Sequence, residues 1–427
     1  MKTIGKTLLA LTLAGIAQTS FAGGTVTVGS EATCSFHTIN DAINSVPSGG
    51  SVTIRLSNNV VSDPFLSIDR NVTLTGGYSN CSDISSDANA PSVIQGIGNN
   101  QPVGFISGFA NPIAVTVSLS RVRIQGGVAP KGAGLRIGGA ASVRLTSVEL
   151  TDNVAGEFGG GVYIDGSNGA QLTIQSDTQL TDNVAIQRGG GIYCLNANTE
   201  SGGKVDFRDG DIVDNVAGAH GGGVYLENCE MTGSLSGERR IASNEVDRVD
   251  YPEAVVDEYG SASGAGIYAT SASHLSLGSR SSTTLIEGNV GRNKVYDGFG
   301  SHYEVDRGDG GGLTLLNDSV AELTNTHIAN NQAADGGGVM VRGLARFELK
   351  RDPGGCIANA NFPGCASLVG NKGRGYDNGF DFCVNSDRNW AGRGGAIAMR
   401  GAFGELDGVW VKGNQAVQTD GCAISDY

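Results

Sequence analysis

The stretch Gly159-Gly160-Gly161-Val162-Tyr163 recurs along this chain and decides its fold. It returns as Gly189-Gly190-Gly191-Ile192-Tyr193 and as Gly221-Gly222-Gly223-Val224-Tyr225, and weaker copies begin at Gly264, Gly310, Gly336, Gly394 and Gly421. An asparagine precedes each copy: Asn153, Asn183, Asn215, Asn244, Asn289, Asn331, Asn371 and Asn414. The first four asparagines follow one another at steps of 30, 32 and 29 residues. A fixed period of this length is typical of a solenoid.

Each repeat carries about three short β segments, such as 161–164, 171–174 and 178–180. Three strands joined by turns correspond to one coil of a parallel β-helix, and each coil pairs with the next about 4.8 Å away. We expect right-handed coiling, the usual hand of parallel crossovers. The apolar residue of each glycine stretch then forms an interior stack: Val162, Ile192, Val224, Ile267, Leu313, Val339 and Ile397.

The repeated asparagines and glycines have structural explanations. A corner asparagine can satisfy backbone groups of its turn and bond to the equivalent asparagine of the next coil. Glycine permits positive φ and close approach between coils. We therefore interpret both series as structural rather than catalytic.

Residues 1–22 read as a secretory signal peptide, with a basic start at Lys2 and Lys6 and an Ala-type cleavage site at Ser20-Phe21-Ala22. Residues 23–113 are predicted to form an N-terminal cap and the first coils, since Phe36, Ile39 and Ile43 give 35–46 a helical apolar face. Residues 114–427 hold the repeats. The signal peptide predicts an exported protein. No later stretch is apolar enough to predict a transmembrane helix.

Composition and cysteines bound the function further. The net charge is −14, so nucleic acid is not an expected partner. Eight cysteines in an exported chain indicate disulfides: Cys34, Cys81, Cys194, Cys229, Cys356, Cys365, Cys383 and Cys422. Proximity in sequence favours the pairs Cys34–Cys81, Cys194–Cys229 and Cys356–Cys365 without fixing them. No CxxC pair is present and there are 5 histidines, so a metal is not expected.

The repeats resemble those of chlamydial-type polymorphic outer membrane proteins. Gly394-Gly395-Ala396-Ile397 matches the GGA[ILV]-type motif, and 241–244, 286–289 and 368–371 match the [FIL]xxN-type motif. The N-terminal part resembles pectin-lyase-like β-helices more generally. The resemblance implies a bacterial surface or extracellular β-helix, often an adhesin. Such proteins usually end in a membrane barrel, and no run of barrel strands precedes Tyr427 here, so self-association or a partner at that end is an alternative.

Three insertions interrupt the repeat at 245–263, 290–309 and 372–393. The usual asparagine-to-glycine gap of six residues grows there to 20, 21 and 23. Because all three leave the same corner of the coil, we expect them to form one binding face. The side chains that we expect to contact a glycan or cell-surface partner are Tyr251, Tyr259, Tyr296, Phe299, Tyr303, Asp306, Asp309, Tyr376, Asp377, Asp381 and Trp390.

The alternative is a polysaccharide lyase or glycoside hydrolase. Hydrolysis needs two carboxyl groups, for which Asp297, Asp306, Asp309, Asp377, Asp381 and Asp387 are candidates, and a lyase needs a base such as Lys294, His302 or Arg374. Spacing selects no pair among them, so the sequence favours a binding protein over an enzyme. The acidic insertions could also hold calcium, although no EF-hand or nonapeptide calcium loop is present.

Overall fold

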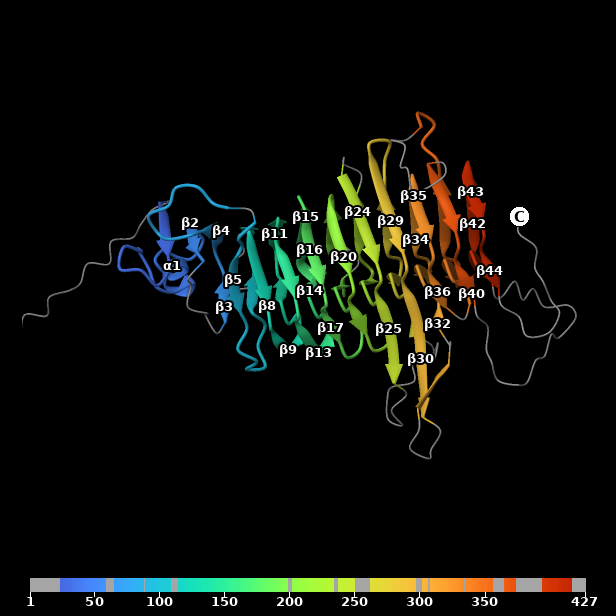
Figure 1. Cartoon of the computed structure of the whole chain (residues 1–427), viewed down its shortest axis with the longest axis horizontal. Helices are drawn as coiled ribbons and strands as arrows, with labels where there is room; N and C mark the ends of the chain where they lie inside the picture. Colours follow the sequence, from blue (N-terminus) through green and yellow to red (C-terminus); the bar gives the residue numbers. More distant parts are fainter. Residues whose placement is uncertain are drawn as a thin grey trace, which may run out of the picture.

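The computed structural model describes the whole chain except residues 1–23, 59–64, 88, 109–113, 199–201, 234–236, 250–261, 297–301, 306–307, 334, 356–364, 374–393 and 417–427. The predicted signal peptide therefore lies outside the described residues. In the part described, the protein is all-β, with long parallel sheets running along one elongated body (Figure 1). This arrangement is consistent with a parallel β-helix or solenoid.

Four sheets run along the body, here named A to D. Sheet A contains, in order, β1 (Thr25–Val28), β2 (Ser51–Ser57), β4 (Asn71–Tyr78), β7 (Val115–Ser120), β11 (Ala141–Thr146), β15 (Gln171–Gln175), β19 (Lys204–Phe207), β23 (Glu230–Gly233), β28 (His274–Leu277), β34 (Val320–Thr324), β38 (Arg346–Lys350) and β42 (Phe403–Asp407). Sheet B contains β3 (Leu66–Ile68), β6 (Gly104–Ser107), β10 (Leu135–Gly138), β14 (Val162–Asp165), β18 (Ile192–Leu195), β22 (Val224–Glu227), β27 (Ile267–Thr270), β33 (Leu313–Leu315), β37 (Val339–Arg342) and β41 (Ile397–Arg400).

Sheets C and D complete each coil. Sheet C contains β5 (Ser92–Gln95), β8 (Val122–Gln125), β12 (Glu149–Thr151), β16 (Thr178–Thr181), β20 (Gly210–Val213), β24 (Gly237–Ala242), β29 (Ser282–Glu287), β35 (Thr326–Ala329), β39 (Ala366–Val369) and β43 (Val409–Lys412). Sheet D contains β9 (Val128–Lys131), β13 (Val154–Phe158), β17 (Val184–Ala185), β21 (Val216–Ala217), β25 (Glu245–Val249), β30 (Val290–Tyr296), β36 (Gln332–Ala333), β40 (Lys372–Gly373) and β44 (Gln415–Ala416), with β31 (His302–Val305) paired to β30.

A typical coil thus runs through sheets B, A, C and D. It contains four strands, one more than the three that the sequence predicts. The strand that sequence reasoning missed is the short one in sheet D, which in β17 and β21 has only 2 residues. Two residues are too few to show an alternating pattern, so only the pairing between coils reveals this strand. It follows the repeated asparagine directly, as Val184 follows Asn183.

The core is the stack of inward residues that the repeat predicts. Val162 pairs with Ile192, Ile192 with Val224 and Val224 with Ile267, and all four are fully buried. Alternate residues of the other sheets, such as Leu172 and Leu180, also point into the same cluster. The alternation of the strands and the in-register stacking of the coils together produce one continuous apolar interior.

The helix predicted at 35–46 is shorter in the structure. α1 spans Ile39–Asn44, and the Thr38 side chain caps it by accepting from the N–H of Asp41. Its buried residues Ile39 and Ile43 join the interior cluster. The helix does not begin at Ser35 because the next residue, Phe36, forms an isolated bridge to Val28.

Two of the three expected disulfides are present, Cys34–Cys81 and Cys194–Cys229. Cys365 is also disulfide-bonded, whereas Cys356, Cys383 and Cys422 lie outside the described residues. Among the residues described, no helix is long and apolar enough to cross a membrane.

Candidate functional site

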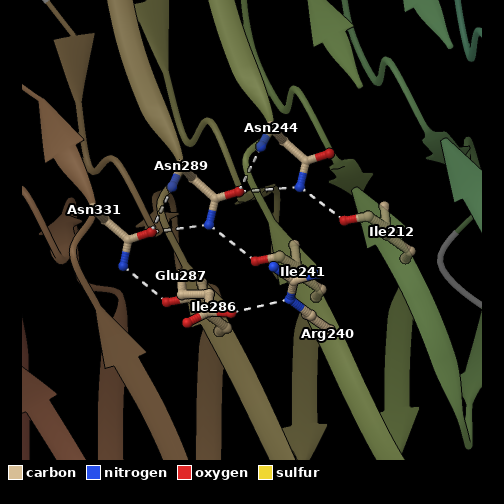
Figure 2. A network of polar contacts seen from close by, with 8 residues as sticks. All are labelled: Ile212, Arg240, Ile241, Asn244, Ile286, Glu287, Asn289 and Asn331. Carbon is tan, nitrogen blue, oxygen red and sulfur yellow. Dashed lines mark hydrogen bonds and ion pairs between the residues drawn. The ribbon is translucent and has the colours of Figure 1, made fainter. Parts of the chain in front are cut away.

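The corner from which the insertions leave is built on a ladder of buried asparagines. Asn244 Nδ2 donates to Oδ1 of Asn289 at 3.0 Å and to the carbonyl oxygen of Ile212 at 2.9 Å. The backbone N–H of Asn244 donates to the same Oδ1 at 3.0 Å, and Asn289 repeats the pattern toward Asn331 (Figure 2). These hydrogen bonds satisfy the backbone of the turn where no water reaches it, because the three asparagines are fully buried.

The ladder continues through every repeat from Asn153 to Asn414. The Nδ2-to-Oδ1 distances between successive members are 2.9 to 3.0 Å. The ladder predicted from the repeat is therefore present, and its members are structural.

The residue before each ladder asparagine adopts the left-handed conformation. Its φ is 55° at Asp152, 55° at Asp182 and 54° at Asp214, and later coils place Ser243, Gly288, Asn330, Gly370 and Gly413 there. Glycine, asparagine and aspartate tolerate this region better than other residues. The sequence preference of the turn therefore has a backbone cause. The first glycine of the glycine stretch also has positive φ, for example 67° at Gly159.

The strands that lead into the insertions begin directly after ladder asparagines: β25 after Asn244, β30 after Asn289 and β40 after Asn371. β25 and β30 pair along their length in parallel, from Glu245 opposite Val290 onward. An ion pair of 3.2 Å between Arg292 and Glu245 joins the two strands. The first two insertions therefore leave the body side by side.

The second insertion begins as an antiparallel hairpin of β30 and β31, in which Val295 lies opposite Tyr303. Figure 1 shows β25 and β30 extending beyond the neighbouring strands of sheet D. The chain returns to the body through β26 (Ala262–Ser263) and β32 (Gly308–Asp309), which pair with each other in parallel. Both ends of the first two insertions are thus anchored in sheets.

The third insertion is not adjacent to the second. β36 pairs with β30 on one side and with β40 on the other, and the coil of β36 carries no insertion. The first two insertions therefore leave adjacent coils, and the third leaves the same corner after one coil without an insertion. The sequence already contained the signal, since Asn331 precedes Gly336 by only five residues.

Asp309, expected to contact a ligand, is buried at the base of the second insertion. Its Oδ2 lies 2.9 Å from Nη1 of Arg342, whose Nη2 lies 4.0 Å from Asp335 Oδ2. Asp309 is only 3% exposed. A buried carboxylate held by an arginine anchors the return strand and is not presented to a ligand.

The remaining expected residues fall in two groups. Tyr296 and Tyr303 lie in the hairpin strands β30 and β31, whose backbone alone is described there. Lys294 and His302, the candidate bases, lie in the same two strands. The other expected contact residues and candidate acids, together with Arg374, lie outside the described residues: Tyr251, Tyr259, Asp297, Phe299, Asp306, Tyr376, Asp377, Asp381, Asp387 and Trp390.

Sequence reasoning missed a column of stacked tyrosines on the outer side of sheet B: Tyr163, Tyr193, Tyr225 and Tyr268. Successive ring centroids are 5.4, 4.8 and 5.0 Å apart and the rings are nearly parallel. The signal was the tyrosine that ends four copies of the glycine stretch. Burial raises the pKa of Tyr163 to about 12, so its phenol is neutral at physiological pH.

Basic side chains lie on this tyrosine column. Arg136 lies over the rings of Phe105 and Tyr163, and Lys131 lies over the rings of Phe158 and Tyr163. Tyr193 and Tyr225 donate from their hydroxyl groups to Oε2 of Glu227, at 3.3 and 3.4 Å. The outer side of sheet B therefore combines aromatic and charged groups.

Among the described residues, one group of metal-ligating side chains is close enough to share an ion: Glu31, Cys34 and Cys81. Both cysteine sulfurs form a disulfide, so this group does not fit a zinc ion.

Comparison of the chain with protein-family models, with curated proteins and with solved structures finds no match.

Proposed function

We propose that this chain is an exported, adhesin-like protein of a bacterial surface, which binds a glycan or a cell-surface partner through the insertion corner. The observation that carries the proposal is the parallel pairing of β25 with β30, since it brings two insertions together on one side of the body. The hairpin of β30 and β31 adds projecting surface beyond the coil.

The asparagine ladder supports this use of the corner. Binding residues are often carried by loops that a rigid scaffold positions, and such loops vary without disturbing the fold. Asn244 and Asn289 stay hydrogen-bonded although the first insertion lies between them in sequence. The scaffold therefore tolerates insertions here, which is the property that a binding corner needs.

The test replaces each insertion with the natural short connection of the repeat. Residues 245–263 and 372–393 are each exchanged for the five-residue sequence of 184–188, and residues 290–308 for that of 184–187 so that Asp309 stays beside Arg342, singly and together. We expect the triple graft to melt within a few degrees of the parent and to lose binding to cells and to a panel of neutral glycans.

A matched control replaces Gln171 and Thr173 with alanine, on the outer side of sheet A, and should bind as the parent does. Binding that survives in the folded triple graft would contradict the proposal. Product analysis in the same wells detects the alternative, polysaccharide cleavage by a lyase or hydrolase. Concentration-dependent sedimentation detects self-association at the C-terminal end.

Three features of the architecture belong to the same proposal. α1 packs against β1, β2 and β3 and is proposed to act as the N-terminal cap. The coils are proposed to be right-handed, and the repeats to be of the polymorphic outer membrane protein type.

Two disulfides and the absence of a membrane-spanning helix in the described part are compatible with export. Calcium in the acidic insertions is tested by adding chelator to the binding assay.

A further inference from the structure

Arg136 is an exposed arginine inserted into a column of aromatic rings. It lies in β10, where it pairs in register with Phe105 of the preceding coil and Tyr163 of the next. Its guanidinium carbon is 5.4 Å from the ring centroid of Phe105 and 5.8 Å from that of Tyr163. Contacts with two rings hold a planar guanidinium in one orientation without neutralising its charge.

No carboxylate in the described part of the chain lies within ion-pair distance of Arg136. Asp165 and Glu157, two acids close to Tyr163, have other partners. Glu157 Oε2 lies 3.6 Å from Nζ of Lys131, and Asp165 Oδ1 accepts from the N–H of Ser167 at 3.2 Å. Because the Tyr163 phenol is neutral at physiological pH, it does not compensate the charge either. The donors of Arg136 are therefore available to an external group.

A second cation approaches the same place. Lys131 Nζ is 5.8 Å from the ring centroid of Tyr163, the same distance as the Arg136 guanidinium carbon. At most twice that distance therefore separates the two charges. Lys131 is already paired with Glu157, so Arg136 is the cation that remains for an external anion.

From these contacts we propose that Arg136, held by Phe105 and Tyr163, binds an oxyanion carried by an extracellular polymer. The guanidinium fork matches a carboxylate, sulfate or phosphate group through two parallel hydrogen bonds. The site lies on sheet B, in a coil that precedes all three insertions, and is independent of the function proposed for the insertion corner.

The experiment measures binding of the mature chain to dextran sulfate, with uncharged dextran of equal length as the reference. We expect binding to the sulfated polymer only, weakening as salt is added. Arg136→Gln should weaken it about tenfold, the effect of losing charge-assisted hydrogen bonds. Phe105→Leu, which keeps the charge but removes one ring, should weaken it less than Arg136→Gln does.

Arg144→Gln is the matched control. Arg144 is an exposed arginine in the next strand along the chain, on sheet A, and among the described residues it makes no ring contact or ion pair. Its loss should change the affinity for dextran sulfate by no more than about twofold, the effect expected of an exposed charge outside the site. Equal losses in both arginine variants would show non-specific attraction and would contradict the proposal, as would unchanged binding in a folded Arg136→Gln.

Competition with free anions shows whether the site recognises the oxyanion itself or another part of the polymer. Inorganic sulfate or phosphate, added at constant ionic strength, should release the polymer, and failure of both to do so contradicts an oxyanion site. The triple graft of the insertions should retain dextran sulfate binding. Loss in the graft with none in Arg136→Gln would overturn this inference. Loss in Arg136→Gln with none in the graft is the expected result, and the insertion corner is then tested separately by its own binding assay.

Discussion

Asn244 and Asn289 are 45 residues apart, yet their Nδ2 and Oδ1 atoms lie 3.0 Å from each other. Asn153 and Asn183 are 30 residues apart and make the same bond at 2.9 Å. The ladder therefore keeps one geometry whether or not an insertion separates its members. Added chain leaves the body after the ladder asparagine and returns before the glycine turn, so the coil itself is unchanged.

Replacing one ladder asparagine should destabilise the whole body. Asn289→Ala removes the donor to the carbonyl oxygen of Ile241 and the acceptor for the N–H of Asn244, both buried. A buried group left without a partner costs about 1 to 3 kcal/mol, so we expect a loss of roughly 3 kcal/mol in the free energy of unfolding. Urea denaturation measures it. Asn198→Ala, at an exposed position, is the control, and an equal loss there would refute the explanation.

The left-handed residue before the ladder should reject β-branched side chains. Asp182 has a φ of 55° and is exposed, so Asp182→Val changes little besides backbone strain. We expect it to lower stability by about 1 to 2 kcal/mol, and Asp182→Gly to be close to neutral. Melting temperatures of the two variants check this. If the Asp182→Val and Asp182→Gly variants melt at the same temperature, the left-handed backbone does not explain the aspartate at this position.

Gly203 leaves room for the disulfide between adjacent coils. A Cβ at this position would lie 2.7 Å from Sγ of Cys194 and 3.0 Å from Sγ of Cys229. Gly203→Ala should therefore destabilise the disulfide-bonded protein, by about 1 to 3 kcal/mol as in other overpacked cores.

The same substitution tested in a Cys194→Ala/Cys229→Ala background should have a smaller effect, because both sulfurs are gone. The effect does not vanish, since Gly166 Cα would still lie 3.0 Å from the new Cβ. Denaturation of all four proteins completes a double-mutant cycle. Additive losses would show that the sulfurs are not the obstacle.

Stability should fall in mild acid because of His327. Burial lowers the pKa of His327 to about 4 from 6.5, so the folded state holds the ring neutral. The unfolded chain takes up the proton first as pH falls, so the loss begins near pH 6.5 and is complete below about pH 4. The loss in the free energy of unfolding should be at most roughly 3 kcal/mol.

His327→Gln should flatten this pH dependence and can still hydrogen-bond to Ser367, whose Oγ lies 2.9 Å from His327 Nδ1. His274→Gln, at a half-exposed histidine on sheet A that lies 3.9 Å from Glu322, is the comparison variant. Unfolding free energies measured between pH 7 and 4 decide the matter. An unchanged slope in His327→Gln would assign the acid sensitivity to other groups.

The sequence by itself determined the repeat, the interior stack and the corner from which the insertions leave. Apolar residues such as Val162 and Ile192 each follow an asparagine by nine residues. They admit one in-register packing, because a slip of one residue would turn every interior side chain outward. The same spacing located the insertions, since extra residues between Asn244 and Gly264 cannot fit inside a coil of constant size. Proximity in sequence also favoured two disulfide pairs that the structure contains.

Only the tertiary structure decided how residues of different coils meet. The two-residue strands of sheet D show no alternation of their own and become strands only by pairing with their neighbours. Asp309 could be recognised as an anchor only once Arg342, from the next coil, was placed 2.9 Å from it. Arg136 likewise became a candidate site only when Phe105 and Tyr163 were stacked against it. Local sequence fixes the period of a solenoid, whereas contacts between coils join residues about thirty positions apart, and their chemistry depends on which side chains the stacking brings together.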